Sequence, residues 1–395
     1  MNDLNVFLKQ KIKNTSKAKK GLTYIDLFSG AGGLSLGFDR NNFTLIQAID
    51  SDRNSIDTFK FNRKEKNDIL CTDIQKIKKF RKANFLVGGP PCQGFSNANQ
   101  QKKIKDERNK LYHHYLKYLD KSGAKYCLME NVIGLKNFYN EISNDFSNFG
   151  FKTFYKIINT SEFGFPQNRK RLFIFGIKTK NEISFESFKN FIQKNLDKYR
   201  ILYTKKYDFN LFDAIGDLPI LKPKNIKNKT SLENDLYGHT VKKFKYKNTP
   251  YSKLINGNIN NKFLLNHKTK YNNLRDIKIY SLLKPGENST AKSIKHLMPY
   301  RSREKIFKDK FYKLDFNKKC KTITSHMYYD CHMYIHPNQA RGLTPREAAR
   351  VQGFPDNYYF CGGTNEWYRQ IGNSVSPLIS NILALIFKDY YEKNN

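Results

Sequence analysis

The sequence predicts an α/β fold with a mainly parallel sheet and helices on both faces. Three observations support this prediction. Short apolar runs that end in carboxylates alternate with segments of helical pattern, a glycine-rich turn follows the first run, and a later run ends in Gly-Gly-Pro-Pro. Open sheets of this kind bind ligands beyond the carboxyl ends of their strands. We therefore expect the functional site at that edge.

The first strand is expected at residues 22–28, followed by a turn at 29–33 and a helix at 34–39. Small residues before a helix let a ligand approach backbone N–H groups, as in nucleotide sites, although a glycine pattern alone is a weak signal. The chain has no Gly-Lys-Ser/Thr phosphate loop. A nucleoside-bearing cofactor therefore fits better than a nucleoside triphosphate.

Carboxylates recur where the first strands end. Asp26 lies in the first strand, Asp50 follows a strand at 44–49, and Asp73 follows one at 69–72. Asp50 stands at about the distance downstream where a carboxylate binds a ribose diol in dinucleotide-type folds. We expect the three carboxylates to share one polar crevice.

The fourth strand, at 83–87, leads into Gly88-Gly89-Pro90-Pro91-Cys92. This stiff loop can hold one thiol in place, which makes Cys92 a candidate nucleophile; the alternative is an ordinary buried cysteine. A further apolar run, 126–132, carries Glu130, whose pKa could be raised enough for it to act as an acid. The polar segment 97–110 is either a lid or a plain solvent loop.

The next elements are an antiparallel pair at 151–158 and 171–177, on either side of Gln-Asn-Arg-Lys-Arg at 167–171. From about 181 to 338 the chain is rich in Lys, Asn and Tyr and is interpreted as a loop-rich second domain or insertion. Mixed basic and aromatic residues suit contacts to phosphates and bases, and a compositional bias is the alternative explanation. We expect no metal site in the Cys/His cluster Cys320, His326, Cys331, His332 and His336, because its spacing matches no common ligand pattern.

Residues 341–355 again carry clear signals of secondary structure. Thr344 as N-cap, Pro345 at the first helical position, Glu347 as capping-box partner and Gly353 at the end predict a helix. An apolar helix at 378–387 is expected in the core.

Length, charge and cysteine content indicate the general class of protein. The chain has 395 residues, enough for two domains, and a net charge of +36 that attracts polyanions such as nucleic acids, although a coding bias towards lysine gives the same excess. Six scattered cysteines without a Cys-x-x-Cys pair favour a reducing, cytoplasmic location. We expect no membrane-spanning segment, and a polar, basic lead at 1–20 without the apolar core of a signal peptide.

Taken together, the motifs resemble the cytosine-5 DNA methyltransferase family. Six pieces occur in the family's order: Asp-Leu-Phe-Ser-Gly-Ala-Gly-Gly at 26–33, Gly-Pro-Pro-Cys-Gln-Gly-Phe-Ser at 89–96, Glu-Asn-Val at 130–132, Gln-Asn-Arg-Lys-Arg at 167–171, the block 341–355, and 370–375. The resemblance implies an S-adenosylmethionine-dependent, Rossmann-like catalytic domain at 21–180 and 341–395. It also implies a target-recognition domain with a hinge at 181–340.

The resemblance also implies site residues. Cys92 would add to C6 of a flipped-out cytosine, Glu130 would hold N3 and the exocyclic amine, and Arg171, with Arg169, would position the base and support the thiolate. Gln167 belongs to the same catalytic group. The residues implied for S-adenosylmethionine, which leaves as S-adenosylhomocysteine, are Phe28, Ser29, Gly30, Ala31, Gly32, Gly33, Asp50, Asp52, Asp73, Ile74, Pro90, Leu111, Asn373 and Val375.

Within that set the ribose ligand stays open, because Asp50 stands where the family more often has Glu and Asp52 could replace it. The implied activity is that of a DNA (cytosine-5-)-methyltransferase acting on duplex DNA. It would be the modification enzyme of a restriction-modification system, a cytoplasmic monomer whose cognate endonuclease acts on the same site without stable binding. A tRNA cytosine-5 methyltransferase and an inactive DNA-binding homologue are the alternatives.

Overall fold

The computed structural model describes residues 22–63, 68–91, 110–229, 231–257, 261–298 and 310–394. These residues form two compact units. The sheet unit contains 22–163, Arg169–Tyr207 and 374–394, and the hairpin unit contains Gly164–Asn168 and Asp208–Asn373. Two sequence motifs are therefore divided, because Gln167 lies in the hairpin unit and Arg169 in the sheet unit, and the motif at 370–375 is cut after Asn373.

The sheet unit is built on seven strands in the order β3-β2-β1-β4-β5-β7-β6. All neighbouring pairs are parallel except those of β7, which is antiparallel to both β5 and β6. The predicted mainly parallel α/β sheet and its antiparallel pair are confirmed. The strands are β1 (Thr23–Leu27), β2 (Thr44–Asp50), β3 (Asp68–Cys71), β4 (Phe85–Gly88), β5 (Tyr126–Asn131), β6 (Phe151–Asn159) and β7 (Lys170–Lys178).

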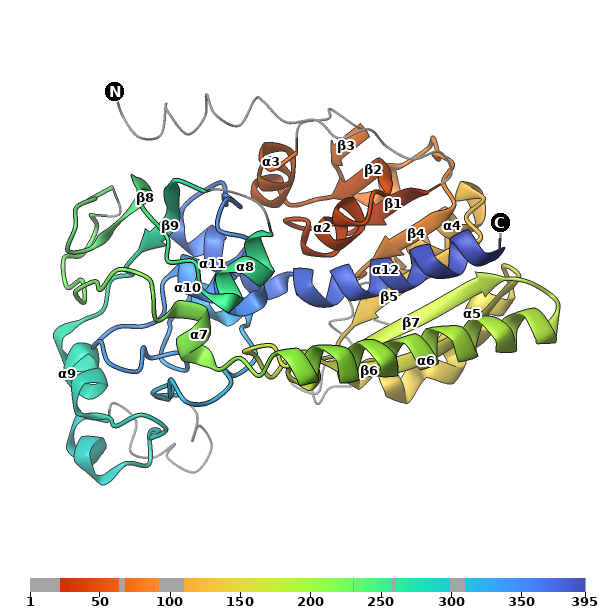
Figure 1. The fold of residues 1–395 in the computed structure, drawn as a ribbon. Coiled ribbons are helices and arrows are strands. Elements are labelled where there is room, and N and C mark those ends of the chain that lie inside the picture. Colours follow the sequence, from red (N-terminus) through yellow and green to blue (C-terminus); the bar gives the residue numbers. More distant parts are fainter. Residues whose placement is uncertain are drawn as a thin grey trace. The chain divides into compact units, whose positions relative to one another are not determined.

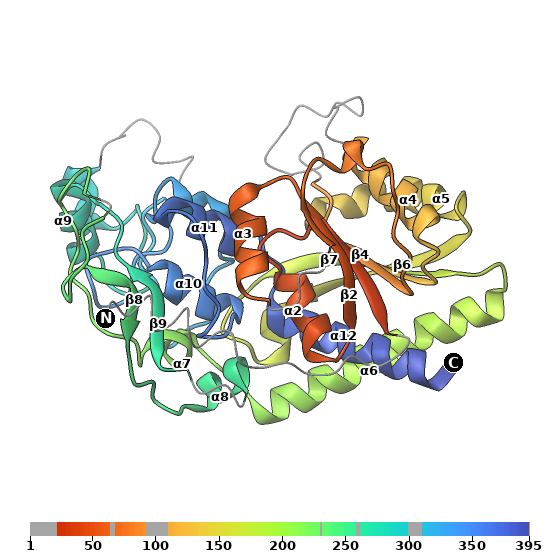
Figure 2. The ribbon, with the colours of Figure 1, turned by 90° about the horizontal axis from the view of Figure 1, so that it is seen from above.

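Helices cover both faces of this sheet (Figures 1 and 2). On one face lie α2 (Gly33–Arg40), α6 (Glu182–Lys206) and α12 (Pro377–Asn394), and α12 packs on both α2 and α6. On the other lie α4 (Lys110–Ser122) and α5 (Tyr139–Ser147). The short α3 (Arg53–Phe61) connects β2 to β3. The order of strands reverses at β1, whose neighbours are β2 and β4, and open sheets bind ligands at such a point.

The strands alternate as a sheet covered on both faces requires. Ile25 and Leu27 pack into the apolar cluster beneath α4 and α5, whereas the Tyr24 ring stacks on Phe38 of α2. Phe387 of α12 meets Phe85 and Phe175 on the same face as Tyr24. Each face therefore has a core of its own.

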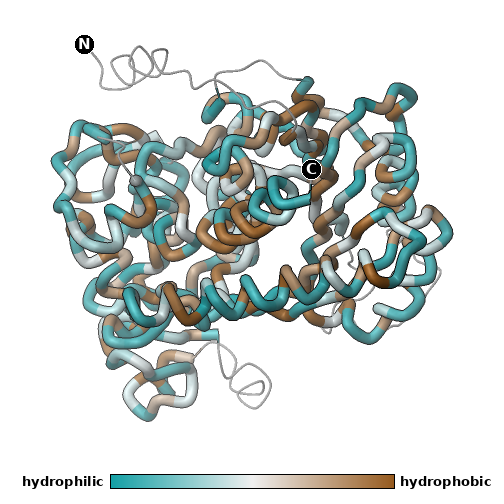
Figure 3. Tube along the Cα trace, turned by 45° about the vertical axis from the view of Figure 1, so that its right-hand side comes forward, coloured by the Kyte–Doolittle hydropathy of each residue, from teal (hydrophilic) through white to brown (hydrophobic). Residues whose placement is uncertain are grey.

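Helix α6 differs from the sequence analysis, which expects loop-rich chain from 181 onward. Asn181 caps the helix by accepting hydrogen bonds from the backbone N–H groups of Ile183 and Ser184. Phe185, Phe188, Ile192 and Leu196 form its buried stripe, and the hydropathy along the helix alternates accordingly (Figure 3). The sheet unit thus extends to Tyr207 and not to 180.

The hairpin unit contains an antiparallel pair, β8 (Gly238–Lys243) and β9 (Phe263–Lys268), and several short helices. These helices are α7 (Leu211–Ile215), α8 (Pro250–Asn256), α9 (Leu274–Leu282), α10 (Pro345–Gln352) and α11 (Thr364–Asn373). The predicted capping box of α10 is present, since Thr344 and Glu347 each accept the other's backbone N–H, and Gly353 ends the helix at φ 89°. By compact unit, α10 and α11 belong with the hairpin and not with the sheet.

Two further sequence expectations bear on the fold. The segment Thr364–Asn394 is long and apolar enough to cross a membrane by length and composition, but 83% of its 18-residue window is buried inside the structure, so α12 is a core helix. Among the described residues no group of three or more His, Cys, Asp or Glu side chains could hold a metal ion.

Candidate active site

The turn between β1 and α2 has an unusual backbone. Phe28, Gly30 and Gly32 all have positive φ, at 57°, 51° and 87°. Such a conformation is costly for phenylalanine and marks sites where the backbone itself has a task. The Ser29 N–H donates to the Ile49 carbonyl at 3.1 Å and the Gly30 N–H to Asp50 Oδ2 at 2.8 Å, so the turn is tied to the end of β2.

This turn leaves room for a ligand. A Cβ built on Gly30 meets nothing within 4 Å among the described atoms, and the buried Ser29 hydroxyl has no hydrogen-bond partner there. Ala31 is buried, and Gly33 begins α2. Open space beside an unpartnered polar atom at a helix start fits a polar cofactor with a nucleoside part.

Asp50 and Asp52 differ in what occupies their carboxylates. Asp50 accepts from the N–H groups of Gly30 and Asp52, both at 2.8 Å, and burial raises its pKa against these hydrogen bonds. Asp52 caps α3, accepting from the N–H and the hydroxyl of Ser55 at 3.2 and 2.6 Å. Asp50 is therefore the carboxylate that faces the glycine turn, and Asp52 holds a helix.

The remaining expected cofactor residues are spread over several elements. Asp73 caps the short 3-10 turn Ile74–Lys76 by accepting from the Gln75 N–H at 2.9 Å, and Ile74 is buried in the core. Pro90 is buried and Leu111, at the start of α4, is half-buried. Val375 is buried in the sheet unit, whereas Asn373 is exposed at the end of α11 in the hairpin unit.

Asp26 lies elsewhere than expected. It is 1% exposed inside β1, and its Oδ2 accepts from the Ser35 hydroxyl at 2.5 Å. Burial, opposed by that hydrogen bond, raises its pKa to about 7. Its side chain therefore belongs to the interior beneath α2 and not to the polar crevice, which is a correction to the sequence analysis.

Glu130 forms an ion pair at the end of β5. Its Oε1 lies 3.2 Å from Arg171 Nε on the adjacent strand β7, and both side chains are largely but not fully buried. A Cβ on Gly89 would stand 3.3 Å from Glu130 Oε2, so the glycine gives the carboxylate its space. Cys92 and the expected lid at 97–109 lie outside the described residues.

Arg169 and Gln167 are more deeply placed. Arg169 is 2% exposed, and its Nη2 donates to the Ser374 carbonyl at 2.9 Å. Arg169, Arg171 and Val375 line a cavity of about 10 Å³, room for about one water. Gln167 is 1% exposed; its amide bonds the Val351 carbonyl and the Gln352 side chain, and accepts from the Ile323 N–H at 2.8 Å. This geometry favours a positioning role for Gln167 over the expected catalytic one.

Sequence reasoning assigned no role to Asn131, although its motif was recognised. Its amide donates to the Pro90 carbonyl at 2.9 Å and accepts from the Val132 N–H at 2.9 Å. Asn131 thereby fixes the loop two residues before Cys92 to the end of β5. Its place directly after Glu130, at a strand end, was the available signal.

Comparisons with known proteins indicate the family of this chain. The family model for C-5 cytosine-specific DNA methylase matches residues 22–388. The type II methyltransferase M.Bpa9945I of Bacillus paralicheniformis is 28% identical over 92% of this chain and 98% of its own length. M.DdeI of Desulfomicrobium norvegicum is 29% identical over 95% of this chain and 90% of its own.

A solved structure gives the same result. An E. coli protein described as a DNA modification methyltransferase encoded within a prophage is 26% identical, with a TM-score of 0.69 over 94% of this chain and 100% of that one. The family uses S-adenosylmethionine as its methyl donor. With a family model that spans nearly the whole chain, the protein belongs to the C-5 cytosine-specific DNA methylase family and is a DNA (cytosine-5) methyltransferase.

Proposed function

We propose that this enzyme methylates C5 of a flipped-out cytosine in duplex DNA through a covalent bond between Cys92 and C6 of the base. C5 of cytosine is a poor nucleophile, and addition of a thiolate to C6 turns the ring into an enamine that can accept a methyl group. The Glu130–Arg171 ion pair, beside the loop that leads to Cys92, is the observation that carries the proposal. A base then removes the C5 proton, and elimination releases the thiolate.

The site residues then have distinct tasks. Glu130 binds N3 and the exocyclic amine and stabilises the charge that develops on the ring, while Arg171 orients the base and favours the Cys92 thiolate. Arg169 supports this arrangement from the interior through Ser374. Gln167 has a positioning role in the hairpin unit, where its amide is held by the Val351 carbonyl and the Ile323 N–H.

For the cofactor, S-adenosylmethionine supplies an electrophilic methyl group when it is bound. The turn from Ser29 to Gly33 would hold the methionine end through backbone N–H groups, and Phe28 would stack on the adenine. Asp50 would accept hydrogen bonds from the ribose hydroxyls, since the Asp52 carboxylate already caps α3. The adenine amine is assigned to Asp73, and the further residues assigned to the cofactor are Ile74, Pro90, Leu111, Asn373 and Val375.

In the cell, we assign the enzyme to a restriction-modification system. The support is that its relatives M.Bpa9945I and M.DdeI are type II methyltransferases. The enzyme would be a cytoplasmic monomer. A cognate endonuclease would act on the same DNA site without binding the methyltransferase stably.

The test is tritiated methyl transfer from S-adenosylmethionine to mixed-sequence duplex DNA and, in parallel, to tRNA. We expect label in DNA alone, no label with Cys92→Ala, and unchanged activity with the control Cys71→Ala, which removes an exposed thiol. Label in tRNA alone would replace the DNA assignment by an RNA substrate. Tight DNA binding without transfer would identify an inactive homologue, and activity in Cys92→Ala would exclude the covalent route.

A further inference from the structure

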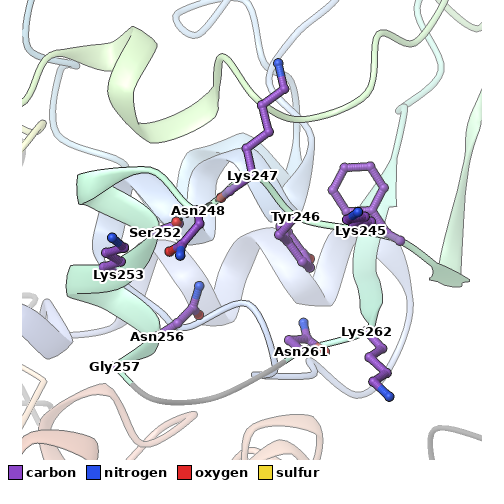
Figure 4. A pocket seen from close by; sticks show the side chains of 11 residues that line it. Lys245, Tyr246, Lys247, Asn248, Ser252, Lys253, Asn256, Gly257, Asn261 and Lys262 are labelled. Carbon is purple, nitrogen blue, oxygen red and sulfur yellow. Dashed lines mark hydrogen bonds between the residues drawn. The ribbon is translucent and has the colours of Figure 1, made fainter.

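The hairpin unit contains a basic pocket of about 510 Å³ that the proposed reaction does not use (Figure 4). Its walls come from the segment after β8, from α8 and from the two residues that directly precede β9. Four lysines line it, and none of its lining residues is acidic. These lysines are Lys245, Lys247, Lys253 and Lys262.

The four lysines differ from other lysines of the same hairpin. Lys242 of β8 pairs with Asp235 at 2.5 Å, and Lys268 of β9 pairs with Glu233 at 3.1 Å. Within the described chain no ion pair involves any of the four pocket lysines, and all four are exposed. The concavity therefore keeps four positive charges that no carboxylate of the described chain neutralises.

The walls that carry these lysines are held by hydrogen bonds, of which those of Asn256 are buried. The Asn256 amide donates to Asp356 Oδ2 and accepts from the Asp356 N–H, both at 2.7 Å. Ser252 donates to the Lys247 carbonyl at 3.0 Å, and Tyr246 donates to the Phe263 carbonyl at 3.1 Å. Because these polar side chains are engaged in the fold, the ammonium groups are the main groups left to bind a ligand.

Four mobile cations on a fixed frame select an anion with several charges. A free nucleotide is usually held in an enclosed and mainly apolar pocket, whereas here the ammonium groups stand open to solvent. A phosphodiester backbone matches this display, because its phosphates bind lysines along a surface without any need to bury the base.

We infer that this pocket binds the phosphate backbone of duplex DNA independently of sequence. The inference rests on the proposed action on duplex DNA and adds a second contact region to it. The pocket contributes affinity equally to every sequence, so it lowers KM for DNA without affecting the choice of target. It leaves KM for the methyl donor unchanged.

The test compares two fourfold alanine variants of the full chain. The pocket variant replaces Lys245, Lys247, Lys253 and Lys262. The control variant replaces four other exposed lysines of the hairpin unit, Lys278, Lys284, Lys292 and Lys295, and so makes the same change in net charge. A third variant restores the pocket charge with four arginines. Binding of a mixed-sequence 30-base-pair duplex is measured against salt concentration.

We expect the pocket variant to bind at least about tenfold more weakly at 0.15 M salt, with the slope of log K against log salt reduced by about 1 for each lost phosphate contact. The control should fall much less, and the arginine variant should retain the slope. Equal losses in the pocket and control variants would overturn the inference and leave the methylation proposal intact. Failure of the wild-type enzyme to bind or methylate DNA would instead overturn the proposed function.

Two further measurements complete the design. The double variants Lys245→Ala/Lys247→Ala and Lys253→Ala/Lys262→Ala replace the fourfold variant if its thermal unfolding differs from wild type, and each should show about half of its loss of slope. Titration with AMP and with inorganic phosphate tests the other source of the same chemistry. A thermal shift that the pocket lysines abolish, with DNA binding unchanged, would assign the pocket to a free nucleotide or phosphate and overturn the DNA inference.

Discussion

The two units treat buried carboxylates in opposite ways. In the hairpin unit, Glu347 binds both terminal nitrogens of Arg341 at 2.8 and 2.7 Å, and Asp356 binds Arg350 at 2.7 and 2.9 Å. Burial opposes ionisation of both carboxyls, but the adjacent arginines outweigh it and hold each pKa below its usual range.

In the sheet unit, Asp26 and Asp50 accept hydrogen bonds from a hydroxyl and from backbone N–H groups, and among the described residues neither has an ion pair. Burial accordingly raises the pKa of each. The difference teaches how buried charge can be used. Charges that a cation fully satisfies hold a fold together, whereas Asp50, which has no cation and faces the glycine turn, retains capacity for a ligand. Glu130, with its single arginine, lies between the two.

The largest expected effect is the loss of stability when a buried carboxylate of the hairpin unit loses its arginine. Arg350→Met leaves Asp356 and Asp217 buried without their cation, which should cost about 3–5 kcal/mol of unfolding free energy. The control is Arg369→Met, which breaks the half-exposed pair with Glu366 and should cost under about 1 kcal/mol. Urea denaturation measures both, and equal midpoints would contradict the structural role of the α10 arginines.

Glu130→Gln, in contrast, should lower activity and leave stability unchanged. The substitution keeps the shape but removes the charge from a partly exposed pair, so we expect an unchanged melting temperature and a loss of about 10²–10³ in kcat/KM for DNA. Glu141→Gln, on an exposed part of α5, is the matched control. A large loss of stability with normal turnover of the folded fraction would place Glu130 among the scaffold charges.

Asp26 makes the comparison testable by pH. Its pKa is raised from 3.8 to about 7, so the folded state holds the proton more tightly, and stability falls as pH rises through 7. Relative to Asp26→Asn, wild type should lose about 2–3 kcal/mol of unfolding free energy between pH 5 and pH 8. Parallel stability curves for the two proteins would show that folding does not raise the pKa of Asp26.

The smallest effect concerns the cofactor. Asp50→Asn keeps one oxygen acceptor, for the Gly30 N–H, and removes the charge together with the acceptor of the Asp52 N–H. We therefore expect KM for S-adenosylmethionine to rise about tenfold, about 1.4 kcal/mol, with kcat little changed. Asp52→Asn is the comparison, because its loss should appear in the stability of α3. A larger rise in KM for Asp52→Asn would reverse the assignment of the ribose ligand.

Local chemistry made much of this molecule predictable from sequence. The capping box at Thr344, the glycine turn after β1 and the strand that ends at Glu130 are each specified by a few neighbouring residues. Helix α6 was missed although Asn181 and the apolar stripe of the helix were visible, because the surrounding Lys and Asn masked the helical period.

Other features depend on partners distant in sequence. Gln167 bonds Val351 and Gln352, more than 180 residues away, so no local pattern could reveal that its amide is engaged in the fold. Asp26 was misassigned for a similar reason, because its burial depends on how α2 covers β1, which the strand sequence does not encode.

The packing of α12 on α2 has a consequence for synthesis. Gly37 has no room for a Cβ, which would stand 2.2 Å from the Ser380 backbone, and the Phe387 ring reaches Phe38, Phe85 and Phe175. The first helix of the sheet unit thus completes its packing only with one of the last segments that the ribosome makes. A nascent chain that ends before residue 377 lacks α12 and leaves the part of that face beneath it uncovered, so a shortened message should yield an aggregating fragment and no methylating enzyme.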